Sequence, residues 1–210
     1  MSWIDLTMPL SVKTPVFPGD PPARFEHVDG IPGAVCNQTQ MTFNTHFGTH
    51  IDAPYHMLSD GKKLSDYPVD RFVGSAVVID VRGQKEIRVQ SADLAAAGVK
   101  RGDFVFFFTG HSAGAFASGY FQDNPVIPLD TAQALIDAGV TLVGLDSFTP
   151  DNAPYDVHKL FFTHDVLILE NLVDLLSVCS SGATRLEVVV APLKLDGADG
   201  APCRVLAKSA

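Results

Sequence analysis

The chain has 210 residues and a formal net charge of −9, with 15 Lys and Arg against 24 Asp and Glu. Apolar residues make up 46% of the sequence and charged residues 19%, which excludes intrinsic disorder and supplies the core of one domain over residues 1–210. The acidic charge disfavours nucleic acid as a partner, and no apolar run in the sequence is long enough to cross a membrane.

Alternating and β-branched residues predict a strand-rich α/β domain. Helices are expected at 91–97 and 130–138, because each segment ends at a glycine, Gly98 or Gly139. The expected strands are 23–28, 35–43, 73–81, 103–109, 140–146, 166–169, 186–192 and 203–207.

The cysteines and the first residues indicate a cytoplasmic protein. Cys36, Cys179 and Cys203 form no CxxC pair, and their odd number argues against a disulfide framework. The segment Met1–Asp5 has neither the basic nor the apolar region of a secretory or transit peptide. We therefore expect a reducing compartment.

Groups that bind metals or move protons cluster within eleven residues, all at even positions. They are His46, His50, Asp52 and His56. In a straight strand, His46 and His50 would lie about 13 Å apart, whereas two nitrogens on one zinc ion lie within about 4.2 Å. Gly48 and Pro54 disfavour a helix here. We therefore predict a strand end followed by an irregular loop, with a turn near Gly48 if the ligands share an ion.

Two imidazoles and one carboxylate suit zinc or manganese and leave coordination positions open for water. The sequence therefore indicates water activation as the chemistry. A single histidine is more often a packed or surface residue than a ligand. The clustering of three histidines beside an aspartate favours a functional site instead.

The segment from His46 to His56 resembles the HGTHxDxPxH signature of the cyclase family, which includes bacterial kynurenine formamidase and isatin hydrolase. Phe47 replaces the first histidine of that string and His46 precedes it, as in the formamidase branch. Further similarities follow in the family's order and cover nearly the whole chain. They are PVFPGD at 15–20, GLDS at 144–147, DVH at 156–158 and ILENL at 168–172. The resemblance implies a single swivelling β/β/α-type α/β domain.

The resemblance also implies a binuclear metal site. His46, His50 and Asp52 would bind one ion, and Asp52 would also reach a second ion. His158 and Glu170 would complete the second position, with Glu170 bridging. The apolar run 166–169 predicts a buried strand that ends at Glu170. Without the first motif, Glu170 would be read as a capping or salt-bridged residue.

Three further residues are interpreted from the resemblance. His56 matches the family's general acid/base, and the ordinary pKa of histidine, near 6.5, suits that role. Phe17 stands where the formamidase branch has a tryptophan that packs on the substrate's aryl ring; its alternative is a place in the core, between Val16 and Pro18. His164 is expected to be structural.

The expected activity is that of a metal-dependent amidohydrolase that cleaves the C–N bond of a small aryl amide, as in conversion of N-formylkynurenine to kynurenine and formate. Two zinc or manganese ions per chain, a small-molecule substrate and a homodimer or larger assembly are implied. One alternative is an isatin hydrolase-like enzyme with a single manganese, or a lactone hydrolase. Another alternative is a non-catalytic metal-stabilised protein. Structural zinc sites are typically rich in cysteine, and the absence of cysteine from the motif argues against this alternative.

Overall fold

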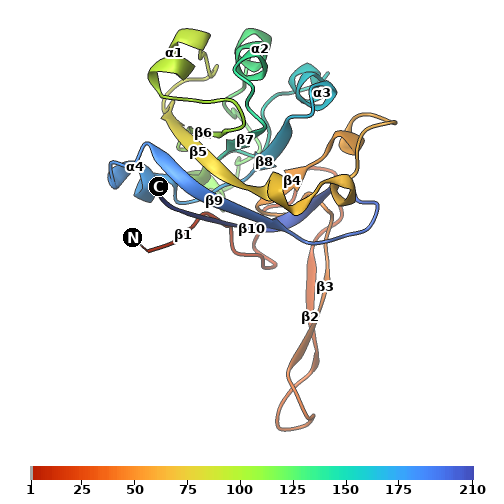
Figure 1. The fold of residues 1–210 in the computed structure, drawn as a ribbon. Coiled ribbons are helices and arrows are strands. Elements are labelled where there is room, and N and C mark those ends of the chain that lie inside the picture. The colour runs from red at the N-terminus through yellow and green to blue at the C-terminus, as the bar shows by residue number, and fades with distance from the viewer. Residues whose placement is uncertain (1) are drawn as a thin grey trace.

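Strands from both halves of the chain pair into one sheet in the computed structural model, which describes residues 2–210 (Figure 1). The strands are β1 (Ile4–Asp5), β4 (His50–Asp52), β5 (Val73–Asp80), β6 (Phe104–Phe108), β7 (Leu142–Leu145), β8 (Leu167–Glu170), β9 (Arg185–Pro192) and β10 (Gly200–Ser209). Their order is β1-β10-β4-β8-β7-β6-β5-β9, and β9 pairs again with β10. The second pairing closes the strands other than β1 into a barrel.

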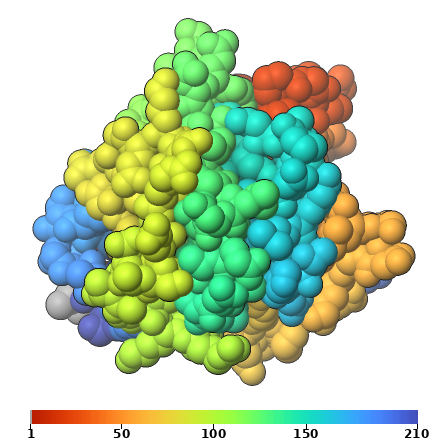
Figure 2. Space-filling model, turned by 90° about the horizontal axis from the view of Figure 1, so that it is seen from above, coloured from red at the N-terminus to blue at the C-terminus, as the bar shows by residue number. Residues whose placement is uncertain are grey.

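Strands β5 to β8 run parallel to one another, and the segments between them carry helices over one face (Figure 1). These helices are α1 (Ser91–Ala96), α2 (Leu129–Asp137) and α3 (Asp156–Thr163). They lie side by side in the view from above (Figure 2). A fourth helix, α4 (Leu175–Ser180), packs on the other side with Leu175 and Val178 buried. No helix within residues 2–210 has the length and apolarity needed to span a lipid bilayer.

The five residues of β6 show how the core is divided. Phe104, Phe106 and Phe108 belong to the cluster on one face of the sheet, whereas Val105 and Phe107 belong to the cluster under α1 to α3. All five are buried. Successive side chains of a strand point to opposite faces, so an uninterrupted apolar run is expected of a parallel strand covered on both faces.

A separate antiparallel hairpin, β2 (Arg24–Asp29) and β3 (Gln38–Thr42), projects away from the barrel (Figure 1). At the barrel end of the hairpin, the ring of Phe43 stacks on Phe25 and on Phe47, with ring centroids 6.1 and 5.2 Å apart. Phe47 is buried and adjoins His46 in sequence. The hairpin is therefore attached directly to the histidine-rich segment.

The predicted strand-rich α/β fold is confirmed, with differences in detail. The strand expected at 35–43 begins only at Gln38. The short elements β1, β4, α3 and α4 were not predicted, nor were the 3₁₀ turns Pro54–His56, Leu64–Asp66, Val69–Phe72 and His111–Gly114. Around His50, a strand end followed by an irregular loop was predicted, and this order of strand and loop was wrong. The turn at Gly48 precedes strand β4, and a 3₁₀ turn follows it, because β4 is held by pairing with distant strands β8 and β10.

Candidate metal centre

The centre is built on the pairing of β4 with β8. His50 lies directly opposite Glu170 in the antiparallel register, and Asp52 follows two residues later on the same face. Nε2 of His50 is 3.3 Å from Oε2 of Glu170 and 3.3 Å from Oδ1 of Asp52. All three side chains are buried. The register alone therefore gathers an imidazole and two carboxylates.

The turn at Gly48 brings His46 back to this group. Gly48 has a φ of +63°, and a Cβ there would lie 2.3 Å from the Leu10 side chain, so glycine suits both the conformation and the space. The rings of His46 and His50 are edge to face, with centroids 5.1 Å apart. Nδ1 of His46 lies 2.7 Å from Oδ1 of Asp52. The expected turn at Gly48 is confirmed.

His158 enters from the first turn of α3. Asp151 Oδ2 accepts hydrogen bonds from the backbone N–H groups of Val157 (2.7 Å) and His158 (3.3 Å), and its Oδ1 pairs with His158 Nδ1. One carboxylate thus holds both the helix start and the ring. Nε2 of His158 faces Glu170 Oε1 at 3.5 Å and Asp52 Oδ2 at 4.0 Å.

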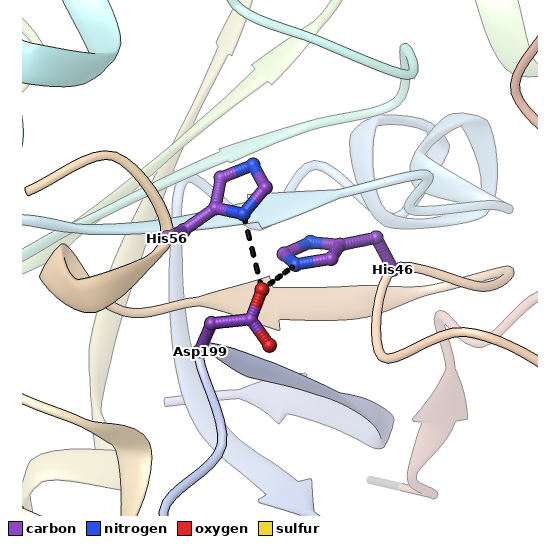
Figure 3. Close-up of side chains that lie close together, drawn as sticks. All are labelled: His46, His56 and Asp199. Carbon is purple, nitrogen blue, oxygen red and sulfur yellow. Dashed lines mark hydrogen bonds and ion pairs between the residues drawn. The ribbon is translucent and has the colours of Figure 1, made fainter. Parts of the chain in front are cut away.

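His56 lies at the end of the 3₁₀ turn that follows β4. Its Nδ1 is 3.2 Å from Oδ2 of Asp199, and Nε2 of His46 is 2.8 Å from the same oxygen. Figure 3 shows the two imidazoles converging on this carboxylate. Asp199 precedes β10, whose Gly200 is paired with Asp52, so the register of β10 delivers Asp199 to the centre.

Electrostatics show that the centre favours positive charge. Burial would lower the pKa of His46, but the Asp52 charge and hydrogen bonds to Asp199 and Asp52 raise it to about 10. Burial raises the pKa of Asp52, but the nearby His46 and His50 charges hold it well below its usual range. Hydrogen bonds from His46 and His56 lower the pKa of Asp199 likewise. The carboxylates therefore favour positive charge at these positions, either as protons on the imidazoles or as a metal ion in their place.

The donor set fits divalent metal ions. His50 Nδ1 donates to the carbonyl of Gly48 at 2.8 Å, which leaves Nε2 as the free lone pair. That Nε2 is buried and has no hydrogen-bond partner among residues 2–210. A lone pair on a buried nitrogen between two carboxylates is unfavourable unless a proton or a metal ion binds it. Two groups of mutually close donor atoms share Asp52: His46, His50 and Asp52, and Asp52, His158 and Glu170.

A cavity of about 500 Å³ opens onto these donors. On one side it is lined by Phe17, Phe121 and Phe148, whose rings are in mutual contact at centroid distances of 5.0–6.2 Å. Phe17 is 43% exposed, so the alternative interpretation of Phe17 as a core residue is wrong. His56 and Asp199 line the same cavity. The site therefore joins a polar centre to an aromatic wall.

The structure brings the predicted site residues together around this cavity, which is lined by Phe17, His46, His50, Asp52, His56, His158 and Glu170. His164 lies apart, at the end of α3, where its Nδ1 is 2.9 Å from the carbonyl of Leu160. Sequence reasoning missed Asp199, Asp151 and Phe121. Of these three residues, only Asp151 had a signal in the local sequence, because it lies seven residues before His158.

Three imidazoles and two carboxylates in an open cavity are a donor set of the kind that metal-dependent hydrolytic enzymes use. Residues 4–152 match the model of the family described as "Putative cyclase", and the chain belongs to that family. The resemblance seen in the sequence is thereby confirmed.

Individual relatives agree with this assignment. Kynurenine formamidase of Bacillus cereus is 34% identical over 210 aligned positions, which cover 97% of this chain and 96% of the relative. A structure described as a potential metal-dependent hydrolase with cyclase activity has 27% identity and a TM-score of 0.80, covering 100% of this chain and 98% of the other. An isatin hydrolase bound to thioisatinate shares the fold, with a TM-score of 0.85, 20% identity and coverage of 98% and 91%.

Proposed function

We propose that the protein is a metal-dependent amidohydrolase that cleaves the C–N bond of a small aryl formamide, of the class of N-formylkynurenine, to an aryl amine and formate. The observation that carries the proposal is the arrangement of His46, His50 and His158. Each ring has one nitrogen held by a carbonyl or carboxylate and the other directed at Asp52 or Glu170. The relatives named kynurenine formamidase support the choice of substrate.

The proposed centre holds two ions, zinc or manganese. His46, His50 and Asp52 would hold one and Asp52, His158 and Glu170 the other, since these two donor groups share Asp52. Glu170 has one oxygen near His50 and the other near His158, which suits a bridge. Nitrogen and oxygen donors without thiolate suit both metals. Such ions supply an acidified water and polarise the substrate carbonyl.

His56 is the proposed catalytic residue. Its Nδ1 is engaged by Asp199, so Nε2 is free in the cavity to take a proton and return it. The leaving group of an amide is a poor one unless its nitrogen is protonated as the C–N bond breaks. Proton transfer by His56 to that nitrogen therefore contributes most where the leaving group is an amine.

The aromatic wall supports an aryl substrate. Phe17, Phe121 and Phe148 offer ring edges and faces to one side of the cavity, and aromatic pairs gain roughly 0.5–1.5 kcal/mol beyond their area burial. A ring placed against this wall would lie in the same cavity as the donors. We assign Phe17 to substrate binding on this ground.

We also propose a homodimer in which the β2–β3 hairpin contacts a second copy. An isolated two-stranded hairpin is at best marginally stable in water, and this one exposes Ile31 (62%), Val35 (98%) and Met41 (57%). Ile31→Asp with Val35→Asp should therefore yield monomers in light scattering. A dimer that survives both changes would exclude the hairpin as the interface.

A cytoplasmic location completes the proposal. Cys36, Cys179 and Cys203 are free cysteines, and within residues 2–210 they form no disulfide. Unpaired thiols are expected in a reducing compartment.

The experiment that tests the activity is a substrate panel with purified protein loaded with zinc or manganese. Formate release from N-formylkynurenine should exceed ring opening of isatin or of an aryl lactone. Metal analysis should give two ions per chain. Preference for isatin with one manganese per chain would replace the formamidase assignment with a cyclic amidase, and inactivity on the whole panel would contradict the hydrolase assignment.

A further inference from the structure

Asp199 lines the cavity and belongs to the ligands of neither proposed ion. Its side chain is 32% exposed, yet both of its oxygens are engaged. Oδ2 receives His46 Nε2 at 2.8 Å and His56 Nδ1 at 3.2 Å, and Oδ1 accepts a hydrogen bond from the Thr45 hydroxyl at 2.9 Å. Three donors from the segment 45–56 thus converge on one carboxylate delivered by β10.

The contact with His56 selects one of two tautomers. A neutral imidazole carries its proton on Nδ1 or on Nε2, and the hydrogen bond made by one nitrogen fixes the state of the other. A carboxylate that accepts from Nδ1 leaves Nε2 as a lone pair. In Figure 3 the second nitrogen of His56 points away from Asp199. Asp199 therefore fixes both the ring orientation and the position of the free lone pair.

The contact with His46 is of a different kind. Nε2 of His46 is held by Asp199, and Nδ1 lies 2.7 Å from Asp52 Oδ1, within the proposed ligand group. A carboxylate that accepts the outer N–H of a ligand histidine orients the ligand and raises its basicity. The same oxygen of Asp199 thus touches one histidine that would hold an ion and one that would move a proton.

We propose that Asp199 is the positioning residue of His56: it holds the imidazole in the Nδ1–H tautomer, with Nε2 as the proton acceptor in the cavity. The inference rests on the proposed function, because it serves the proton transfer assigned to His56. As water oxygen adds to the carbonyl carbon, one water proton passes to Nε2. As the C–N bond breaks, that proton passes to the leaving nitrogen. Asp199 remains ionised throughout.

Steady-state kinetics of Asp199→Ala test this role. The assays use saturating metal, so that the sites stay filled even if the loss of the His46 contact weakens ion binding. We expect retained ions, little change in KM, and a loss of roughly 10- to 100-fold in kcat on an aryl formamide. An aryl formate ester with a good leaving group should lose much less. Asp196→Ala removes an exposed charge from the same loop and should leave both rates unchanged.

A double-mutant comparison separates action through His56 from an independent effect. In a His56→Ala background, adding Asp199→Ala should cost less than about threefold, because residues that act as a unit are non-additive. If Asp199→Ala lowers kcat in the His56→Ala background by as much as it does in the wild type, the inference is overturned. Loss of ions from Asp199→Ala at saturating metal would also overturn it, since Asp199 would then act as a ligand.

A spectroscopic measurement of the His56 tautomer tests the inference without relying on activity. In zinc-loaded protein, ¹⁵N shifts of His56 should report the Nδ1–H tautomer. Asp199→Ala should move His56 towards the Nε2–H form, and Asp196→Ala should not. An unchanged tautomer would overturn the inference even if the enzyme hydrolyses aryl formamides. If the wild type is inactive but Asp199→Ala shifts the tautomer, the proposed function is contradicted, whereas the assignment of Asp199 as the group that fixes the tautomer of His56 stands.

Discussion

His50 and Glu170 face each other across the β4–β8 pair, with Nε2 of one 3.3 Å from Oε2 of the other. Both side chains are buried, and Asp52 adds a second carboxylate on the same face. Burying two acids is unfavourable unless positive charge accompanies them. The stability of this part of the barrel is therefore coupled to what occupies the space between these groups.

Metal removal should lower thermal stability as well as activity. Without the metal ions, only protons on the imidazoles compensate the charges of Asp52 and Glu170, and metal binding to the folded state no longer contributes to stability. Calorimetry before and after chelation, with metal content verified, measures the fall in Tm, and re-addition of metal should restore it. An unchanged Tm after verified removal would contradict a shared centre.

Replacing Asp52 with Asn should remove both ions together. The substitution keeps the shape but removes an anion shared by the two donor groups. Glu170→Gln should behave in the same way, because its oxygens lie near both His50 and His158. Elemental analysis gives the ion count, with the exposed Glu187→Gln as the matched control. A loss of one ion in Asp52→Asn would show that Asp52 is no bridge.

His56→Ala should separate catalysis from metal binding. The variant should keep its ions and lose roughly 10²–10⁴ in rate on an aryl formamide. An activated aryl ester needs little protonation of its leaving group, so its hydrolysis should be largely retained. Parallel assays of both substrates with metal analysis decide the point. If the variant loses metal, His56 is a ligand and the role given to His158 must be reassigned.

Phe17→Ala should weaken binding of aryl substrates. The change removes a ring that contacts Phe121 and Phe148 at the cavity wall, and a loss of roughly 0.5–1.5 kcal/mol corresponds to a rise in KM of about twofold to tenfold. Steady-state kinetics should show this with kcat little changed. Phe116→Ala, an exposed ring absent from the cavity lining, is the control. Equal effects in the two variants would exclude a specific role for Phe17.

The stabilising effect of Asp165 should depend on pH. Burial raises the pKa of Asp165, but hydrogen bonds from Tyr67 and Lys62 hold it below its ordinary value of 3.8. A depressed folded-state pKa stabilises the protein above pH 3.8, and this contribution is lost as the pH falls through the lower folded value. Asp165→Asn should therefore destabilise at pH 6, and this effect should shrink as the pH falls below 3.8. Denaturant unfolding across this range measures the difference; a constant difference would contradict the coupling.

The parallel strands could be predicted because their signal is local. Phe104–Phe108 is an uninterrupted apolar run, and β8 is a short apolar run ending in an acid. Strand β4 has three residues, and its pairing partners lie more than a hundred positions away. Its geometry depends on contacts that no short window of sequence contains. The error in the order of turn and strand around His50 has the same cause.

The site residues likewise divide into those that the sequence could predict and those that it could not. His46, His50, Asp52 and His56 could be found because they lie within one segment, and the family resemblance supplied His158 and Glu170. Asp199 lies 143 positions from His56. Nothing local distinguishes it from Asp196, which is exposed in the same loop. Its role becomes visible only once the register of β10 against β4 is known.

The position of β4 between β8 and β10 also bears on the order of folding. Pairings between segments so far apart in the chain form slowly, because the intervening loop must close before the contacts can compensate for its lost entropy. His50 and Asp52 therefore have no ordered framework until both distant strands have docked. The donor groups on β4 can therefore come together with Glu170 and Asp199 only once both of these pairings have formed.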